Sequence, residues 1–289
     1  LVAAGVVYIL LSLLVRLWGP GFIQRLLPPV VVGPVIMVIG LGLASVAVNM
    51  AMGKAGDGSA QLVEYNTAIL IAGASLITTI IVAVFAKGIF RLVPILAGVL
   101  VGYALSWLLG VTDFTQVAAA PWLAVPDFVT PEFQLAAILF MIPVAIAPAI
   151  EHIGDVLAIG GVTGKNYLEK PGLQNTLLGD GIATSAAAFF GGPPNTTYSE
   201  VTGAVMLTRN FNPNVMVWAA VFAMALAFID KFGAALLSMP VPVMGGILCL
   251  LFGSIAVVGM NTLIQNQVDL SRPRNLCIVS VTLVFGIGG

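Results

Sequence analysis

Long, uninterrupted apolar runs constrain this chain more than any other feature of its sequence. A bilayer core about 30 Å thick takes about 20 apolar residues in a helix, so each run predicts a membrane span or a large part of one. The runs are continuous and do not alternate with polar residues, which argues against a transmembrane β-barrel. Nine runs have the length of a helix: 1–19, 28–52, 66–86, 89–112, 133–161, 173–191, 214–238, 242–264 and 275–289.

The composition excludes the main soluble classes of protein. Of the 289 residues, 60% are hydrophobic and only 8% are charged, whereas soluble domains carry about 25% charged residues. Eleven basic against twelve acidic residues leave no basic surface for nucleic acid. Cys249 and Cys277 lie inside apolar runs, which indicates small buried hydrophobes and not a disulfide pair. We therefore expect an all-α polytopic protein of the cell membrane, with the lipid bilayer as its surroundings.

The distribution of basic residues predicts the orientation of the spans. When the connections are assigned alternately to the two sides, nine basic residues fall on one side and only Lys54 on the other. An excess of Lys and Arg marks the cytoplasmic side. The count requires that a shorter tenth segment, residues 200–209, also crosses the membrane. The nine residues are Arg16, Arg25, Lys87, Arg91, Lys165, Lys170, Arg209, Arg272 and Arg274.

Two proline-rich stretches predict an internal repeat. Residues 27–36 align without a gap with residues 239–248, so that Pro28 matches Pro240 and Gly33 matches Gly245. Seven predicted spans separate the two starts, and an odd number makes matching helices cross in opposite senses, as in inverted-repeat transporters. A seven-helix period predicts fourteen spans in a complete protein. Since about ten are present and both ends lie inside apolar runs, we expect a chain truncated at both termini.

Acidic residues within predicted spans mark the candidate functional positions. Glu151 and Asp155 are four residues apart, so they lie on one helical face. Two carboxylates in apolar surroundings are suited to proton exchange. His152, the only histidine, points about 100° away from Glu151 and is either a hydrogen-bonded packing residue or a functional one. Asp180 is predicted near mid-depth, as a third acid of the site, a supporting acid or the partner of a backbone group.

The stretch 191–200, Gly-Gly-Pro-Pro-Asn-Thr-Thr-Tyr-Ser-Glu, cannot continue a helix because two prolines precede β-favouring residues. The ten residues from Glu200 to Arg209 span about 15 Å as a helix, which is half of the bilayer core. With Arg209 at the cytoplasmic face, Glu200 lies near the midplane. We therefore predict a short extended stretch followed by a half-helix whose N-terminus points at the bilayer centre. The alternative is an ordinary loop with a short helix.

A charged dipeptide lies within the predicted span 214–238. Asp230 and Lys231 are adjacent, so their side chains cannot face each other on a helix. We expect each to have its own structural partner, unless Lys231 extends its side chain toward the membrane interface.

Three motifs resemble those of the nucleobase–cation symporters, also called nucleobase–ascorbate transporters, and of their uracil/xanthine permease branch in particular. The motifs are Glu151-His-Ile-Gly154, Gly192-Pro-Pro-Asn-Thr-Thr-Tyr-Ser-Glu200 and Met239-Pro-Val-Pro-Val-Met-Gly-Gly246. The family signature reads here as Glu200-Val-Thr-Gly203, four residues, and Thr208-Arg209, with Val201 where Asn is expected.

The resemblance implies a fold of fourteen helices in two inverted seven-helix repeats, divided into a core and a gate domain. By that pattern the chain is a single membrane transport domain that contains helices four to thirteen. The core would comprise residues 1–19 and 133–238, and the gate residues 28–112 and 242–289. By the same pattern the first three helices would be absent from the chain, and with them the extended stretch of the third helix that would pair with Thr196–Tyr198.

The resemblance also assigns roles to residues. Glu151 and Glu200 resemble the family's two substrate-binding glutamates, Ser199 a residue whose backbone contacts the base, and Tyr198 lies beside it. The expected proton-coupling residues are Asp155, Glu151 and Glu200, and the supporting residues are Asp180, His152, Asn195 and Thr197. Asp155 stands where uracil permeases often have His, and Phe252 replaces a Tyr found in some of them, so the choice of base stays open.

The expected function is proton-coupled nucleobase symport, with uracil as the first candidate. One alternative is a purine permease for xanthine or urate, and another is an anion exchanger of similar architecture. A single histidine without a cluster of catalytic partners argues against an enzyme. The expected partners are a nucleobase, a proton and a second copy of the chain, with no nucleic acid, cofactor or metal.

Overall fold

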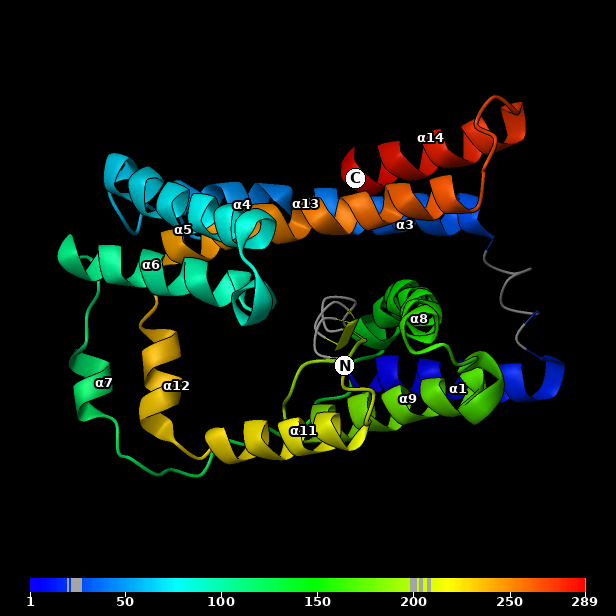
Figure 1. Ribbon diagram of the computed structural model, residues 1–289, viewed down its shortest axis with the longest axis horizontal. Coiled ribbons are helices and arrows are strands. Elements are labelled where there is room, and N and C mark those ends of the chain that lie inside the picture. Colours follow the sequence, from blue (N-terminus) through cyan, green and yellow to red (C-terminus); the bar gives the residue numbers. More distant parts are fainter. Residues whose placement is uncertain (20, 22–27, 198–201, 203–204, 207–208, 289) are drawn as a thin grey trace. The chain divides into compact units, whose positions relative to one another are not determined.

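The computed structural model describes residues 1–19, 21, 28–197, 202, 205–206 and 209–288. Within these residues the chain is helical, and its only β feature is an isolated antiparallel bridge between Lys54 and Gln61. The helices of the described part (Figure 1) are α1 (Val2–Trp18), α3 (Pro29–Gly42), α4 (Ala44–Ala51), α5 (Tyr65–Phe85), α6 (Pro94–Leu108), α7 (Thr115–Ala119), α8 (Leu135–Thr163), α9 (Leu173–Phe189), α11 (Asn214–Leu226), α12 (Asp230–Leu237), α13 (Val241–Gln265) and α14 (Pro273–Gly288).

Several of these helices have the length and composition of membrane spans, which confirms the expected all-α polytopic membrane protein. Four stretches are long and apolar enough to cross a bilayer: Pro29–Ala51, Tyr65–Phe85, Leu135–Thr163 and Val241–Ile264. The apolar helices α1, α6 and α14 are shorter. The predicted run 214–238 differs from a straight span, because α11 and α12 meet at a bend of 86°. Asp230 begins α12, and an acid in the first turn interacts favourably with the helix dipole.

The described residues divide into two compact units. The first unit comprises Leu1–Val32 and Asp127–Phe211, and the second comprises Gly33–Pro126 and Asn212–Gly289. Helices α11 and α12, which we expect in the core domain, are grouped here with the second unit. The assignment of segments to core and gate stays a prediction.

In the first unit, α1 packs against α9 and α8 (Figure 1). The backbones of α1 and α9 come so close that a Cβ atom at Gly5 would lie 2.6 Å from the carbonyl oxygen of Gly181, so both helices need a glycine at the crossing. Apolar side chains from all three helices form the buried cluster: Ala4, Val7, Tyr8, Leu11, Val15, Ala145, Ala149, Leu173 and Leu177.

In the second unit, the α3–α4 pair lies along α13 in the antiparallel sense (Figure 1). Glycines line this contact: a Cβ atom at Gly33 would lie 2.9 Å from the oxygen of Gly259, one at Gly40 2.5 Å from the oxygen of Phe252, and one at Gly245 only 2.1 Å from the nitrogen of Ala51. Helix α5 packs against α6 and α13. The unit is therefore held by close backbone packing, as is usual where lipid surrounds the helices.

Candidate functional site

Helix α8 carries three of the residues predicted for the site. Glu151 is half-buried, whereas His152 is 4% and Asp155 5% exposed. The helix continues through Pro143 and Pro148, although each proline removes one backbone donor from the helix. The spacing of four residues places Glu151 and Asp155 on one face, as the sequence predicts.

Helix α9 presents a polar row to the same region. Thr176, Asp180 and Thr184 follow one another at intervals of four residues, so their side chains lie along one face. Thr184 is 1% exposed, and the Asp180 side chain is 26% exposed. The sequence pointed to Asp180, but Thr176 and Thr184 were missed. Their spacing from Asp180 within an otherwise small and apolar helix is the signal that could have found them.

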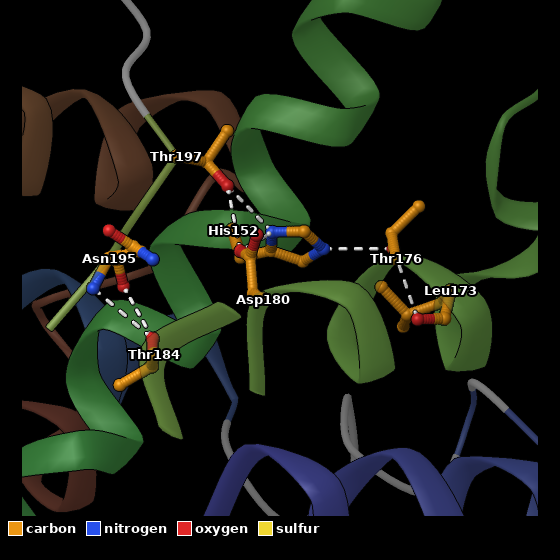
Figure 2. Close-up of polar contacts among 7 residues, drawn as sticks. All are labelled: His152, Leu173, Thr176, Asp180, Thr184, Asn195 and Thr197. Atoms are coloured by element: carbon orange, nitrogen blue, oxygen red, sulfur yellow. Dashed lines mark hydrogen bonds and ion pairs between the residues drawn. The ribbon is translucent and has the colours of Figure 1, made fainter. Parts of the chain in front are cut away.

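The chain after α9 forms what we call the proline segment, residues 192–197, which is neither helix nor strand. The two prolines account for this end of helical structure. The Thr184 hydroxyl lies 3.1 Å from the Asn195 nitrogen and 3.2 Å from the Asn195 oxygen, and so satisfies both backbone groups of that residue (Figure 2). Thr184 therefore ties the middle of the segment to α9.

His152 is the centre of the polar contacts in the first unit (Figure 2). Its Nδ1 atom lies 2.9 Å from Asp180 Oδ2 and 2.7 Å from Thr197 Oγ1, and its Nε2 atom lies 2.8 Å from Thr176 Oγ1. The Thr197 hydroxyl donates to Asp180 Oδ2 across 3.1 Å. The histidine thus joins α8, α9 and the proline segment, and the four residues predicted as supporting ones, including Asn195, lie together.

Tyr8 is a further residue of this region that the sequence analysis did not identify. It lies on α1 and is 2% exposed, and its hydroxyl lies beside the hydroxyl of Thr196 in the proline segment. The carboxylates of Asp180 and Glu151 lie close enough to act electrostatically on the Tyr8 hydroxyl. A single tyrosine within the otherwise apolar run from Val2 to Leu11 is the sequence signal for such a position.

The predicted substrate-binding residues Tyr198, Ser199 and Glu200 lie outside the described residues, as does Val201. The structure therefore describes Glu151 from the predicted pair of glutamates, and it describes the proline segment as far as Thr197. Within the described part of the chain, no group of three or more His, Cys, Asp or Glu side chains is arranged to hold a metal ion.

Lys231 has a structural role within the second unit, which is one of the two outcomes that the sequence left open. Its ammonium group donates to the carbonyl oxygens of Val117, at 2.9 Å, and Ala118, at 3.3 Å. These carbonyls lie in the last turn of α7, where a cation is favoured by the helix dipole. The same group lies 5.5 Å from the centroid of the Trp122 ring, within cation–π range.

Comparison with known proteins identifies relatives along the whole chain. A family model described as "Permease family" matches residues 1–289. A "Probable uracil permease" of Pasteurella multocida (strain Pm70) is 60% identical over 289 residues, which are 100% of this chain and 68% of the relative. The corresponding protein of Haemophilus influenzae (strain ATCC 51907 / DSM 11121 / KW20 / Rd) is 59% identical over 98% of this chain and 67% of its own length. The "Uracil permease" of Bacillus subtilis (strain 168) is 45% identical over 99% of this chain and 67% of its own length.

Proposed function

The chain belongs to this permease family of multi-pass membrane transporters, and on that basis we propose that the protein brings uracil into the cell together with a proton. The identity of 60% over the full chain to a probable uracil permease supports uracil as the substrate. Membership also makes the protein a transporter and not an enzyme.

The contact between His152 and Thr197 is the observation that carries the proposed site. Glu151 precedes His152, and Tyr198 follows Thr197, so this 2.7 Å contact holds together the two segments that bear the proposed binding residues. A carboxylate can only accept hydrogen bonds, and uracil presents ring N–H donors. We therefore assign the ring N–H groups to Glu151 and Glu200, with the backbone beside Ser199 contacting the base.

Proton coupling is proposed for the carboxylates of α8 and for Glu200. Asp155 is buried one helical turn from Glu151, and an ionised carboxylate in apolar surroundings is costly. Protonation, or a hydrogen bond from the substrate, lowers the cost of moving the site past the rest of the protein. The site therefore moves more readily with the proton and the substrate bound than without them, and this difference couples the transport of the two.

An inverted repeat is supported by the way α3–α4 and α13 meet. The alignment of Pro28 with Pro240 relates each residue to the one 212 positions later, which makes Gly40 equivalent to Phe252. Gly40 and Phe252 also meet where α3 crosses α13 in the antiparallel sense, since a Cβ atom at Gly40 would lie 2.5 Å from the oxygen of Phe252. A residue that touches its own equivalent lies on a two-fold axis, so this contact is the expected centre of a repeat with fourteen helices when complete.

Uptake and competition assays test the choice of substrate. The complete protein is expressed in a host that lacks its own uracil transporter, and uptake of radiolabelled uracil is competed with unlabelled uracil, xanthine and urate. Competition by uracil alone is expected. Stronger competition by xanthine or urate would favour the purine permease instead, which the acid at position 155 makes the second candidate.

The coupling role is tested separately with Asp155→Asn. This change removes the charge and keeps the size of the side chain, so we expect proton-driven accumulation of uracil to fall more than equilibrium binding. Equal loss of accumulation and binding, or loss of neither, would contradict a coupling role for Asp155. Thr163→Val on the same helix is the matched control, because among the described residues the Thr163 hydroxyl bonds only to carbonyls of its own helix.

A further inference from the structure

The bend between α11 and α12 frees a backbone carbonyl, and a segment from elsewhere in the chain satisfies it. In a continuous helix the carbonyl of Phe228 would accept from the N–H of Phe232, four residues later. Here the Phe232 N–H donates to the carbonyl of Ile229 instead, across 2.9 Å. The Phe228 carbonyl accepts from the N–H of Ala124, across 3.1 Å. Since an unsatisfied carbonyl is costly in a membrane protein, the bond from Ala124 stabilises the bend.

Lys231, in the first turn of α12, makes a second link to the same segment. Its ammonium group donates to the carbonyls of Val117 and Ala118 and lies over the ring of Trp122. Both carbonyls lie at the end of α7, a helix of five residues that is too short to supply their donors itself. Residues 113–124, which we call the strap, are therefore bonded to α12 and to the bend before it.

Helix α6 holds the other end of α12. The hydroxyl of Tyr103 on α6 lies 2.5 Å from the hydroxyl of Ser238, the residue that follows α12, and 3.4 Å from the carbonyl oxygen of Ala235. The ring of Phe114, in the strap, meets the ring of Tyr103 edge-on. The strap, α6 and α12 all belong to the second unit, in which α12 lies beside α7 (Figure 1). Helix α12 is thus bonded at both of its ends within this unit.

Helix α11, on the other side of the bend, is held differently. None of its residues is buried, so little packing resists a change in its direction. Between the two helices, Ile229 has an extended backbone, with φ −92° and ψ 90°. A few residues at the end of a helix are enough to absorb the rotation of a hinge. The bend at residues 227–229 is therefore suited to let α11 change its direction while α12 stays in place.

We propose that the strap fixes α12 within the second unit, so that the bend at residues 227–229 takes up the movement of α11 during transport. The boundary between the moving parts then lies at this bend, and not at residue 238, where the expected core segment ends. The link to transport rests on the proposed function, whereas the attachment of α12 by the strap does not.

Distances between pairs of spin labels test the proposal in the complete protein, with its own cysteines replaced by serine. The labels are attached to cysteines at three exposed positions, Val84 of α5 as the reference, Leu237 of α12 and Phe222 of α11, which are 65%, 82% and 66% exposed. When uracil is added, we expect the distance from Val84 to Leu237 to stay constant and the distance from Val84 to Phe222 to change. A change at Leu237, or a constant distance at Phe222, would overturn the proposal.

Lys231→Met tests the strap itself, because methionine fills similar space but cannot donate to the carbonyls of α7. We expect the distribution of Val84–Leu237 distances to broaden. Uracil uptake should slow several-fold at an unchanged Kd, since α12 carries no proposed binding residue and a released α12 would follow α11. Lys231→Arg, which keeps the donors, is the control and should stay close to the wild type. An unchanged distance distribution in Lys231→Met would overturn the proposal.

A disulfide can take the place of the lost lysine. Ala124 and Phe228 share a backbone hydrogen bond, so cysteines at these two positions lie close together. Oxidation of Ala124→Cys/Phe228→Cys should leave uptake unchanged in the presence of Lys231 and restore it in Lys231→Met, because the strap stays on the bend throughout transport. Each single-cysteine variant, oxidised in the same way, is the matched control. Uptake that is lost on oxidation and regained on reduction would overturn the proposal.

Two further results separate the proposal from loss of folding and from the proposed function. A thermal melt identifies a variant that does not fold, and Trp122→Leu, which removes only the ring beneath the ammonium group, then replaces Lys231→Met. If the complete protein neither binds nor takes up uracil, the proposed function fails. The distance distribution in Lys231→Met still supports or overturns the attachment of α12 in that case.

Discussion

The two units treat their buried polar side chains differently. In the second unit the fully buried hydroxyls bond to carbonyls four residues earlier in their own helix: Ser75 to Ile71, Thr79 to Ser75 and Ser106 to Gly102. In the first unit the buried polar groups bond across elements, Ser12 of α1 to the carbonyl of Gln174, Thr184 of α9 to Asn195, and His152 of α8 to α9 and the proline segment.

The difference shows what each set of polar groups does. A hydroxyl that donates to a carbonyl of its own helix has a hydrogen-bond partner whether it faces lipid or a packed interior. Such a bond constrains no other element. A hydroxyl or imidazole that bonds across elements fixes their relative position, and removing it leaves a partner unsatisfied. Among the buried side chains that the structure describes, polar groups therefore fix elements relative to one another in the first unit, whereas in the second unit only less buried groups such as Lys231 bond across elements.

The largest effect is expected for Glu151→Gln in the complete protein. Gln keeps one acceptor but loses the charge, and a lost charge-assisted hydrogen bond is worth about 1.5–3 kcal/mol, or about tenfold to a hundredfold in the Kd for uracil. Calorimetric titration measures this change. A variant that melts at a lower temperature but binds uracil normally would show that Glu151 supports the fold and not the substrate.

A cross-element bond is tested by Thr184→Val. The change is nearly isosteric, but it leaves the N–H and C=O groups of Asn195 without the threonine that now satisfies both. Because Asn195 is exposed, we expect a loss of about 1–2 kcal/mol in unfolding free energy, since a typical intramolecular hydrogen bond contributes about 0.5–1.5 kcal/mol net. The Tm in detergent measures this loss. Thr184→Ser should keep most of the wild-type stability, because serine retains the hydroxyl.

Two matched serine changes compare the units directly. Ser12→Ala removes a bond from α1 to α9, whereas Ser106→Ala removes a bond to a carbonyl of its own helix; both side chains are 3% exposed or less. We expect about 1 kcal/mol of destabilisation for Ser12→Ala and less than about 0.5 kcal/mol for Ser106→Ala. Equal losses in Tm for the two variants would contradict the distinction between the units.

The smallest effect is expected at the start of α5, in the second unit. The hydroxyl of Thr67, 2.8 Å away, holds the pKa of the exposed Glu64 below its usual value of 4.5, and the Thr67 backbone N–H adds to this. The stability contributed by ionised Glu64 is therefore present above pH 4.5 and is lost as the pH falls through the lower pKa of the folded state. Glu64→Gln should lower Tm slightly at pH 7 and not at pH 3, and Thr67→Val should do the same.

Most of the helices, and the acids within them, could be predicted from the sequence. The length of an apolar run predicts the length of a span directly. A spacing of four residues predicts that two side chains share one face of a helix, and for this reason Glu151 and Asp155 were identified together. The bend at Asp230 was not predicted, because the apolar run continues across it and hydropathy does not register a change of direction. Tyr8, Thr176 and Thr184 were missed for a related reason, since each is an ordinary residue of its own helix.

His152 illustrates both what the sequence determines and what only the tertiary structure decides. By itself the sequence determined that this histidine lies in a membrane helix and points away from Glu151, because helical geometry depends only on local spacing. Its partners Thr176, Asp180 and Thr197 lie 24, 28 and 45 residues later in the chain. Only the packing of α1, α8 and α9 decided that they meet, since contacts between distant residues depend on how whole helices pack, and helical periodicity does not encode that.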